Sequence, residues 1–182
     1  MNTYIALLRG INVSGKNKIK MAELKVSLQK LSLEKVTTYI QSGNIVFQSE
    51  STSLTELQAL ISECILKDFG LTVPTLVLES NELEQIIANN PYLKNESVDP
   101  AKVYYTFLEA APAPGLFETI DIDAYLPEEF ILSDRTIYFH CPTGYGKTKL
   151  NNNFFEKKLK VRATTRNVKT SNKLLEMASG LG

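Results

Sequence analysis

The chain has 182 residues but no tryptophan, one histidine and two cysteines. Cys64 and Cys141 are far apart and neither belongs to a CxxC pair, which is typical of two reduced thiols in a cytoplasmic protein. His140 precedes Cys141, but neighbours on a strand point to opposite faces, so we expect no cysteine–histidine dyad. Since metal centres need several clustered ligands, we expect neither a metal nor a cofactor. The carboxylate-rich stretch 121–129 indicates a solvated loop.

Long apolar runs are also missing. No stretch approaches the roughly 20 apolar residues that span a bilayer, so we expect no membrane partner. The apolar run near the N-terminus is short and follows no positively charged region, which favours a strand over a signal peptide.

The formal net charge is zero, which excludes a uniformly basic nucleic-acid binder. The charges are nevertheless uneven: residues 1–20 hold four basic and no acidic residues, and residues 144–182 hold nine basic and two acidic residues. A local basic patch can bind anions whatever the total charge. The two ends would make one site only if they met in space. Solvated helix faces with acidic neighbours would explain the same pattern.

The two halves of the chain show the same order of predicted elements. In the first half, periodicity and turn residues predict strands at 4–8, 36–41, 44–48 and 71–78, with helices from 21, over 54–65 and over 81–88. In the second half they predict strands at 103–108, 130–132, 136–140 and 161–165, with helices over 112–119, over 149–159 and after 170.

Each half therefore reads βαββαβ with a trailing helix, which is the ferredoxin-like arrangement. We predict an α+β fold of two tandem ferredoxin-like repeats with antiparallel sheets. The repeats would occupy residues 1–90 and 101–182, joined by a linker over 91–100, as separate domains or as one compact unit.

Two predicted strand-to-helix loops combine glycines with cations. Glycine lets backbone N–H groups approach an anion, and lysine or arginine supplies the countercharge. The candidate residues of the two loops are Arg9, Gly10, Asn12, Gly15, Lys16 and Lys18, and then Gly144, Gly146, Lys147 and Lys149. The second loop imitates the end of a P-loop, but Cys141 stands where that motif needs a glycine. Both loops could also serve simply as turns.

Four further polar residues are candidates for ligand contacts. Arg166 and Asn167 follow the last predicted strand, and a planar guanidinium suits phosphate or carboxylate. Gln41 and Asn44 flank the predicted Ser-Gly turn of the first hairpin, where their amides could face a ligand or satisfy the turn backbone.

Several of these segments together resemble a bacterial family called domain of unknown function 1697. The similar stretches are 8–17, 20–21, 39–44, 144–150, 163–167 and 172–174. Ser14 and Val168 depart from it, standing where the family usually has glycine and commonly has tryptophan. The resemblance implies a cytoplasmic α+β protein of two ferredoxin-like repeats and implies no activity.

Three functions remain open on the sequence. The first is a protein that binds a phosphorylated small molecule or nucleic acid through the basic loops. The second is an enzyme that acts on a nucleotide or another phosphorylated small molecule. The third is an interaction module without a small ligand. The sequence does not determine the oligomeric state.

Overall fold

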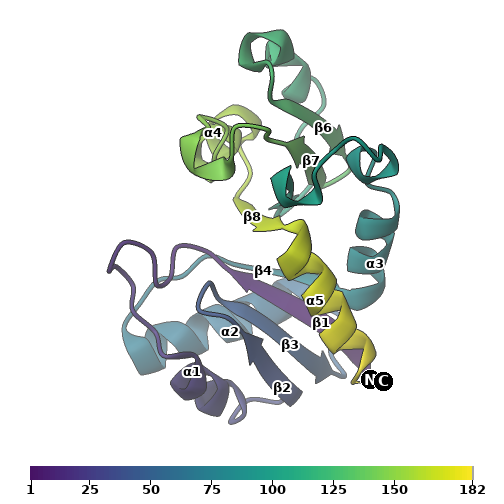
Figure 1. Cartoon of the computed structure of the whole chain (residues 1–182). Coiled ribbons are helices and arrows are strands. Elements are labelled where there is room, and N and C mark those ends of the chain that lie inside the picture. Colours follow the sequence, from purple (N-terminus) through teal and green to yellow (C-terminus); the bar gives the residue numbers. More distant parts are fainter. Residues whose placement is uncertain (182) are drawn as a thin grey trace. The chain divides into compact units, whose positions relative to one another are not determined.

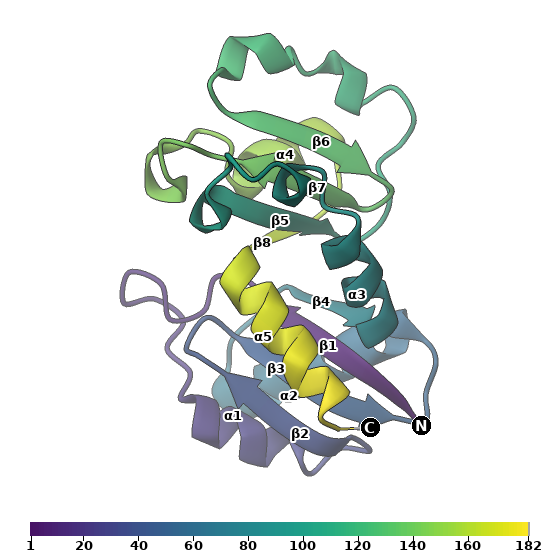
Figure 2. The ribbon, with the colours of Figure 1, turned by 45° about the vertical axis from the view of Figure 1, so that its right-hand side comes forward.

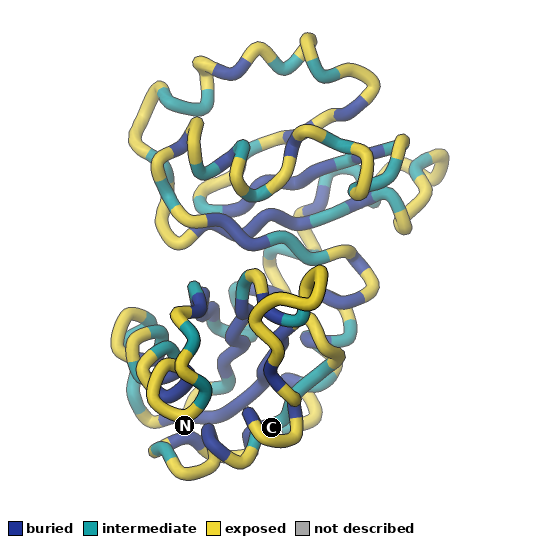
Figure 3. Tube along the Cα trace, turned by 90° about the vertical axis from the view of Figure 1, so that its left-hand side faces the viewer, coloured by how far each residue is buried: buried dark blue, intermediate teal, exposed yellow. Residues whose placement is uncertain are grey.

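A computed structural model describes residues 1–181 (Figure 1). These residues form two compact units, 1–84 with 173–181, and 85–172. The fold is mixed α+β, and each unit contains one four-stranded antiparallel sheet. Figure 3 shows buried stretches of the chain inside each unit and exposed ones at its outer turns.

The first unit follows the predicted order of elements. Its elements are β1 (Asn2–Leu8), α1 (Met21–Leu28), β2 (Glu34–Tyr39), β3 (Asn44–Ser49), α2 (Leu54–Phe69) and β4 (Thr75–Glu79). The strands lie in the order β2-β3-β1-β4. The ends of α2 are those predicted by its sequence: the Ser53 side chain accepts from the Glu56 N–H, and Gly70 ends the helix in the left-handed conformation.

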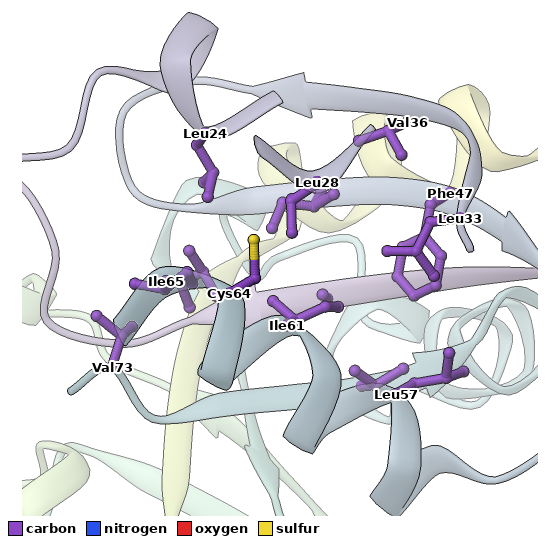
Figure 4. Packing of buried hydrophobic residues seen from close by; sticks show 14 of the residues in the cluster. Leu24, Leu28, Leu33, Val36, Phe47, Leu57, Ile61, Cys64, Ile65 and Val73 are labelled. Atoms are coloured by element: carbon purple, nitrogen blue, oxygen red, sulfur yellow. The ribbon is translucent and has the colours of Figure 1, made fainter. Parts of the chain in front are cut away.

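The core of the first unit lies between its sheet and helices α1 and α2. Alternate residues of β1, Tyr4, Ala6 and Leu8, join this cluster because successive strand side chains point to opposite faces. Figure 4 shows Leu28 of α1 above Ile61 and Cys64 of α2 within the same cluster.

The second unit repeats the sheet but not every helix. It contains β5 (Val103–Leu108), β6 (Glu129–Ser133), β7 (Thr136–His140), α4 (Asn152–Leu159) and β8 (Ala163–Asn167), with the strand order β6-β7-β5-β8. The helix predicted over 112–119 is wrong. Short 3-10 turns at Phe117–Thr119 and Ile122–Tyr125 take its place, because two prolines and Gly115, at φ +85°, interrupt the segment.

Helices α3 (Ser80–Ala88) and α5 (Val168–Ser179) each contain a boundary between the units. From Lys173 onward, α5 belongs to the first unit, where Figures 1 and 2 show it across the sheet face opposite α2. The Leu181 carbonyl accepts hydrogen bonds there from Gln48 Nε2 at 3.2 Å and Lys35 Nζ at 2.7 Å. The proposed repeat boundaries at 91–100 stay a prediction, but residues 173–181 belong to the first unit.

No helix within residues 1–181 has both the length and the apolar character that crossing a bilayer requires.

Candidate functional site

The loop between β1 and α1 contains a short β-hairpin over residues 12–17, which we call the tip hairpin. The Lys16 N–H donates to the Val13 carbonyl at 2.9 Å, and the Asn12 N–H donates to the Asn17 carbonyl at 3.1 Å. Ser14 and Gly15 form the turn with φ of +50° and +75°. Two positive φ angles in a two-residue hairpin loop are typical of a type I′ turn. The candidate loop is therefore an ordered structure.

Asn12 ties the tip hairpin to the neighbouring β2–β3 turn. Its Nδ2 donates to the carbonyls of Gln41 at 2.8 Å and Ile19 at 2.9 Å, and its Oδ1 accepts from the Ile19 N–H at 2.9 Å. Asn12 has φ +53°, a conformation that asparagine tolerates better than most residues. The structure thus brings Asn12 and Gln41 together, but the contact of Gln41 uses its backbone carbonyl.

The β2–β3 turn is fixed by close packing and by an asparagine amide. Gly43 is buried, and a Cβ built on it would lie 2.6 Å from Leu8 Cβ. Asn44 is fully buried, and its Nδ2 donates to the Tyr39 carbonyl at 3.0 Å and to Ser42 Oγ at 2.9 Å. Of the two roles considered for Asn44, these contacts are those of a residue that satisfies the turn.

The cations of this first loop differ in their surroundings. Lys16 and Lys18 are exposed, and neither forms an ion pair with a residue in the described part of the chain. Lys20 pairs with Glu23 at 3.1 Å. Arg9 is half-buried, with its backbone N–H bonded to the Pro74 carbonyl at 3.0 Å. The loop between β1 and α1 therefore presents two exposed lysines without countercharge, together with Gly10 and Gly15.

A buried carboxylate holds the second candidate loop, residues 143–149. Glu128 accepts hydrogen bonds from Thr148 Oγ1 at 2.6 Å, Thr143 Oγ1 at 3.0 Å and Cys141 Sγ at 3.3 Å. The prediction of a solvated loop is wrong for Glu128, which is 8% exposed. A carboxylate can be buried at low cost only when donors such as these compensate for its lost hydration. Thr143 and Thr148 lie 15 and 20 positions from Glu128 in the sequence, so folding brings them together.

The 143–149 loop does not have the geometry of a P-loop. Gly144, at φ +92°, precedes a 3-10 turn over Tyr145–Lys147, and α4 begins only at Asn152. No helix N-terminus therefore follows Gly146 directly, although P-loops use one to bind phosphate. Lys147 and Lys149 are exposed and form no ion pair within residues 1–181.

Arg166 lies close to the 143–149 loop through Tyr145. Burial lowers the pKa of the Arg166 guanidinium to about 10, and the neighbouring Tyr145 opposes this shift, so the group stays charged at neutral pH. Arg166 Nη1 donates to the Thr165 carbonyl at 2.9 Å. Tyr145 packs on Tyr104, with ring centroids 5.1 Å apart. Asn167 instead caps α5, because its Oδ1 accepts from the Thr170 N–H at 2.8 Å.

Four buried polar atoms of the second unit have no hydrogen-bond partner among the described residues. They are Asn90 Nδ2, Tyr105 Oη, Thr164 Oγ1 and Ser171 Oγ. Burial also raises the pKa of Tyr105. Such atoms are uncommon in folded proteins because each loses its hydration without compensation. No sequence pattern marked these positions.

The loop between β1 and α1 belongs to the first unit, and the 143–149 loop belongs to the second. Of the basic residues in 144–182, only Lys173 lies in the first unit, and it pairs with Glu176 at 2.6 Å. The described residues contain no group of three or more histidine, cysteine or carboxylate side chains that could hold a metal ion.

Comparison with known families covers the first of these loops, and the matched region ends before the second. A family model described as "Protein of unknown function (DUF1697)" matches residues 1–138. The chain belongs to this family. The conserved bacterial protein SP0830 from Streptococcus pneumoniae has a similar structure, with a TM-score of 0.68 and 28% sequence identity over 97% of this chain and 98% of that chain. No curated protein matches. The DUF1697 resemblance is confirmed, and the family carries no assigned activity.

Proposed function

We propose that this protein of the DUF1697 family binds the phosphate backbone of nucleic acid. The observation that carries the proposal is that both hydrogen-bonded loops present exposed lysines that form no ion pair. Lys16 lies in the tip hairpin and Lys18 follows it, and Lys147 and Lys149 lie on either side of Thr148, whose side chain donates to Glu128. Lysines without carboxylate partners leave their charge available to an anion.

The exposure of these lysines favours a polyanion over a small phosphorylated ligand. A small-molecule site encloses its ligand and directs a few polar groups at it. Lys16 lies instead at an exposed hairpin turn, and Lys147 and Lys149 are solvent-exposed as well. A nucleic-acid backbone needs only cations along its path, because counterion release supplies much of the binding free energy. A phosphorylated small molecule is the second candidate, supported by Arg166, which is partly buried beside Tyr145.

The fold supports a more specific architectural proposal. We infer that each half is a ferredoxin-like repeat, because both sheets have equivalent strand orders, β2-β3-β1-β4 and β6-β7-β5-β8. The second repeat would have replaced its first helix by the 3-10 turns at Phe117–Thr119 and Ile122–Tyr125. The buried thiols Cys64 and Cys141, with no disulfide between them, are consistent with the proposed cytoplasmic location.

Fluorescence anisotropy with labelled single-stranded and duplex oligonucleotides over a salt series tests the proposal. We expect the logarithm of affinity to fall linearly with the logarithm of salt by about 0.7–0.9 per phosphate contact. The double variants Lys16→Gln/Lys18→Gln and Lys147→Gln/Lys149→Gln should each reduce that slope by about 1–2. As a control for lost charge, Lys67→Gln should leave the slope unchanged.

The outcomes separate the candidates. If inorganic phosphate, nucleotides or sugar phosphates raise the melting temperature while oligonucleotides do not bind, the small-ligand function replaces the proposed one. If oligonucleotides bind but the loop variants behave like Lys67→Gln, the assignment to these loops is wrong. Both candidates are refuted if no oligonucleotide binds at low salt and no phosphate compound raises the melting temperature.

A further inference from the structure

A cavity of about 560 Å³ opens in the first unit, away from the tip hairpin. It lies where the α1–β2 connection, the end of β3 and the beginning of α2 come together. Its size is within the range of small-molecule sites. All of its lining residues belong to the first unit.

The aliphatic part of this cavity is continuous with the protein core. Four leucines line it, Leu31, Leu33, Leu57 and Leu60. Leu33 and Leu57 are 6% and 1% exposed and belong to the core cluster, and Leu31 and Leu60 pack against that cluster. Figure 4 shows Leu33 beside Phe47 of β3, with Leu57 on α2 below it. A packed core holds these side chains in place before a ligand arrives.

The charged side chains of the lining are all acidic, and the N-terminal ammonium of Met1 is the one cationic group beside them. Glu34, Glu50 and Glu56 line the cavity, and its lining includes no lysine, arginine or histidine. All three glutamates are exposed, so their charges lie toward the solvent-facing side. Glu56 Oε2 accepts from Ser51 Oγ at 3.2 Å, which orients that carboxylate. Neither Glu34 nor Glu50 forms an ion pair with another described residue.

We propose that this cavity binds an aliphatic amine. The alkyl chain would lie against the leucines, where its burial is favourable at about 25 cal/mol per Å². The ammonium group would lie among the three carboxylates, whose negative charge attracts it. The same carboxylates would repel an anion. The site is independent of the proposed function, because a phosphate ligand would be repelled by the same glutamates.

Three probes with the same six-carbon chain separate the contributions of charge and chain. Hexylammonium, hexanol and hexanoate are titrated into the full chain, and two-dimensional NMR follows the methyl groups of Leu57 and Leu60. We expect hexylammonium to bind with a dissociation constant of about 1 mM, since a seven-atom ligand gains limited free energy. Hexanol should bind more weakly, and hexanoate should leave both methyl signals unchanged.

Matched glutamate variants test the role of charge. Glu50→Gln and Glu34→Gln should each weaken hexylammonium binding about two- to fivefold, as expected for exposed ion pairs. Glu63→Gln removes the same charge from α2 at a position outside this cavity and should leave the affinity unchanged. Equal binding of hexanoate, equal effects of Glu50→Gln and Glu63→Gln, or unchanged Leu57 and Leu60 signals would overturn the proposal. None of these results bears on oligonucleotide binding.

Discussion

Replacement of Gly43 by alanine should destabilise the first unit by a steric effect that can be isolated. Gly43 has φ +81°, and a Cβ there would lie 2.6 Å from Leu8 Cβ and 2.8 Å from Ile11 Cδ1. Ile11 could move the end of its side chain. Leu8 Cβ cannot, because it is attached to β1, which pairs with β3 on one side and β4 on the other. The backbone of the turn would therefore have to shift.

The expected magnitude follows from two contributions. A left-handed conformation costs an L-residue roughly 1–2 kcal/mol, and overpacking of a dense core costs about 1–3 kcal/mol. Gly43→Ala should therefore lower the free energy of unfolding by about 2–5 kcal/mol. Gly15→Ala is the matched control, because Gly15 has φ +75° but a Cβ at that position would have no atom within 4 Å. It should cost only the conformational part, about 1–2 kcal/mol.

Urea unfolding of the full chain, with hydrogen exchange of the β1 amides to report on the first unit, measures both variants. The difference between them gives the steric contribution. The reasoning is refuted if Gly15→Ala costs as much as Gly43→Ala. It is also refuted if the Gly43 variant exchanges its β1 amides at the wild-type rate.

Three further perturbations test the second unit and the thiols. Tyr138→Phe removes a hydroxyl that donates to a backbone carbonyl of α3 at 3.1 Å and should cost about 1 kcal/mol in urea unfolding. Tyr105→Phe removes a buried hydroxyl that forms no hydrogen bond of good geometry and should cost less. Glu128→Ala removes the shared acceptor of three donors and should cost about 3 kcal/mol, with faster amide exchange over 141–149. An unchanged exchange rate would contradict this role of Glu128. Burial raises the pKa of Cys64 and Cys141 above the ordinary 9.0, so both thiols stay protonated to a higher pH in the folded chain than in the unfolded chain. The free energy of unfolding should therefore fall as pH rises above 9.0, and replacing both thiols by alanine should flatten that fall.

Patterns within a few residues predicted most of the elements. The order of strands and helices follows from apolar periodicity, and the ends of α2 follow from Ser53 and Gly70. The exception is the helix predicted over 112–119 after a proline-rich start, where the prolines and Gly115 leave only 3-10 turns.

The candidate site was predictable only in part. The sequence located the loops, their glycines and their cations. It did not reveal that Asn12 uses its amide to bind Ile19 and Gln41, or that Asn167 caps α5. Asparagine is common both in ligand-binding sites and in turns, so the residue type alone does not distinguish a ligand contact from a structural role.

The sequence by itself determined which segments become strands and helices and where cations and glycines coincide, because those properties depend on neighbours along the chain. Only the tertiary structure decided what these segments contact. Gln48 meets the Leu181 carbonyl across 133 positions, which assigns the end of the chain to the first unit. Glu128 is buried because threonines 15 and 20 positions away surround its carboxylate. Such contacts arise from packing of the folded chain, and local patterns do not encode them.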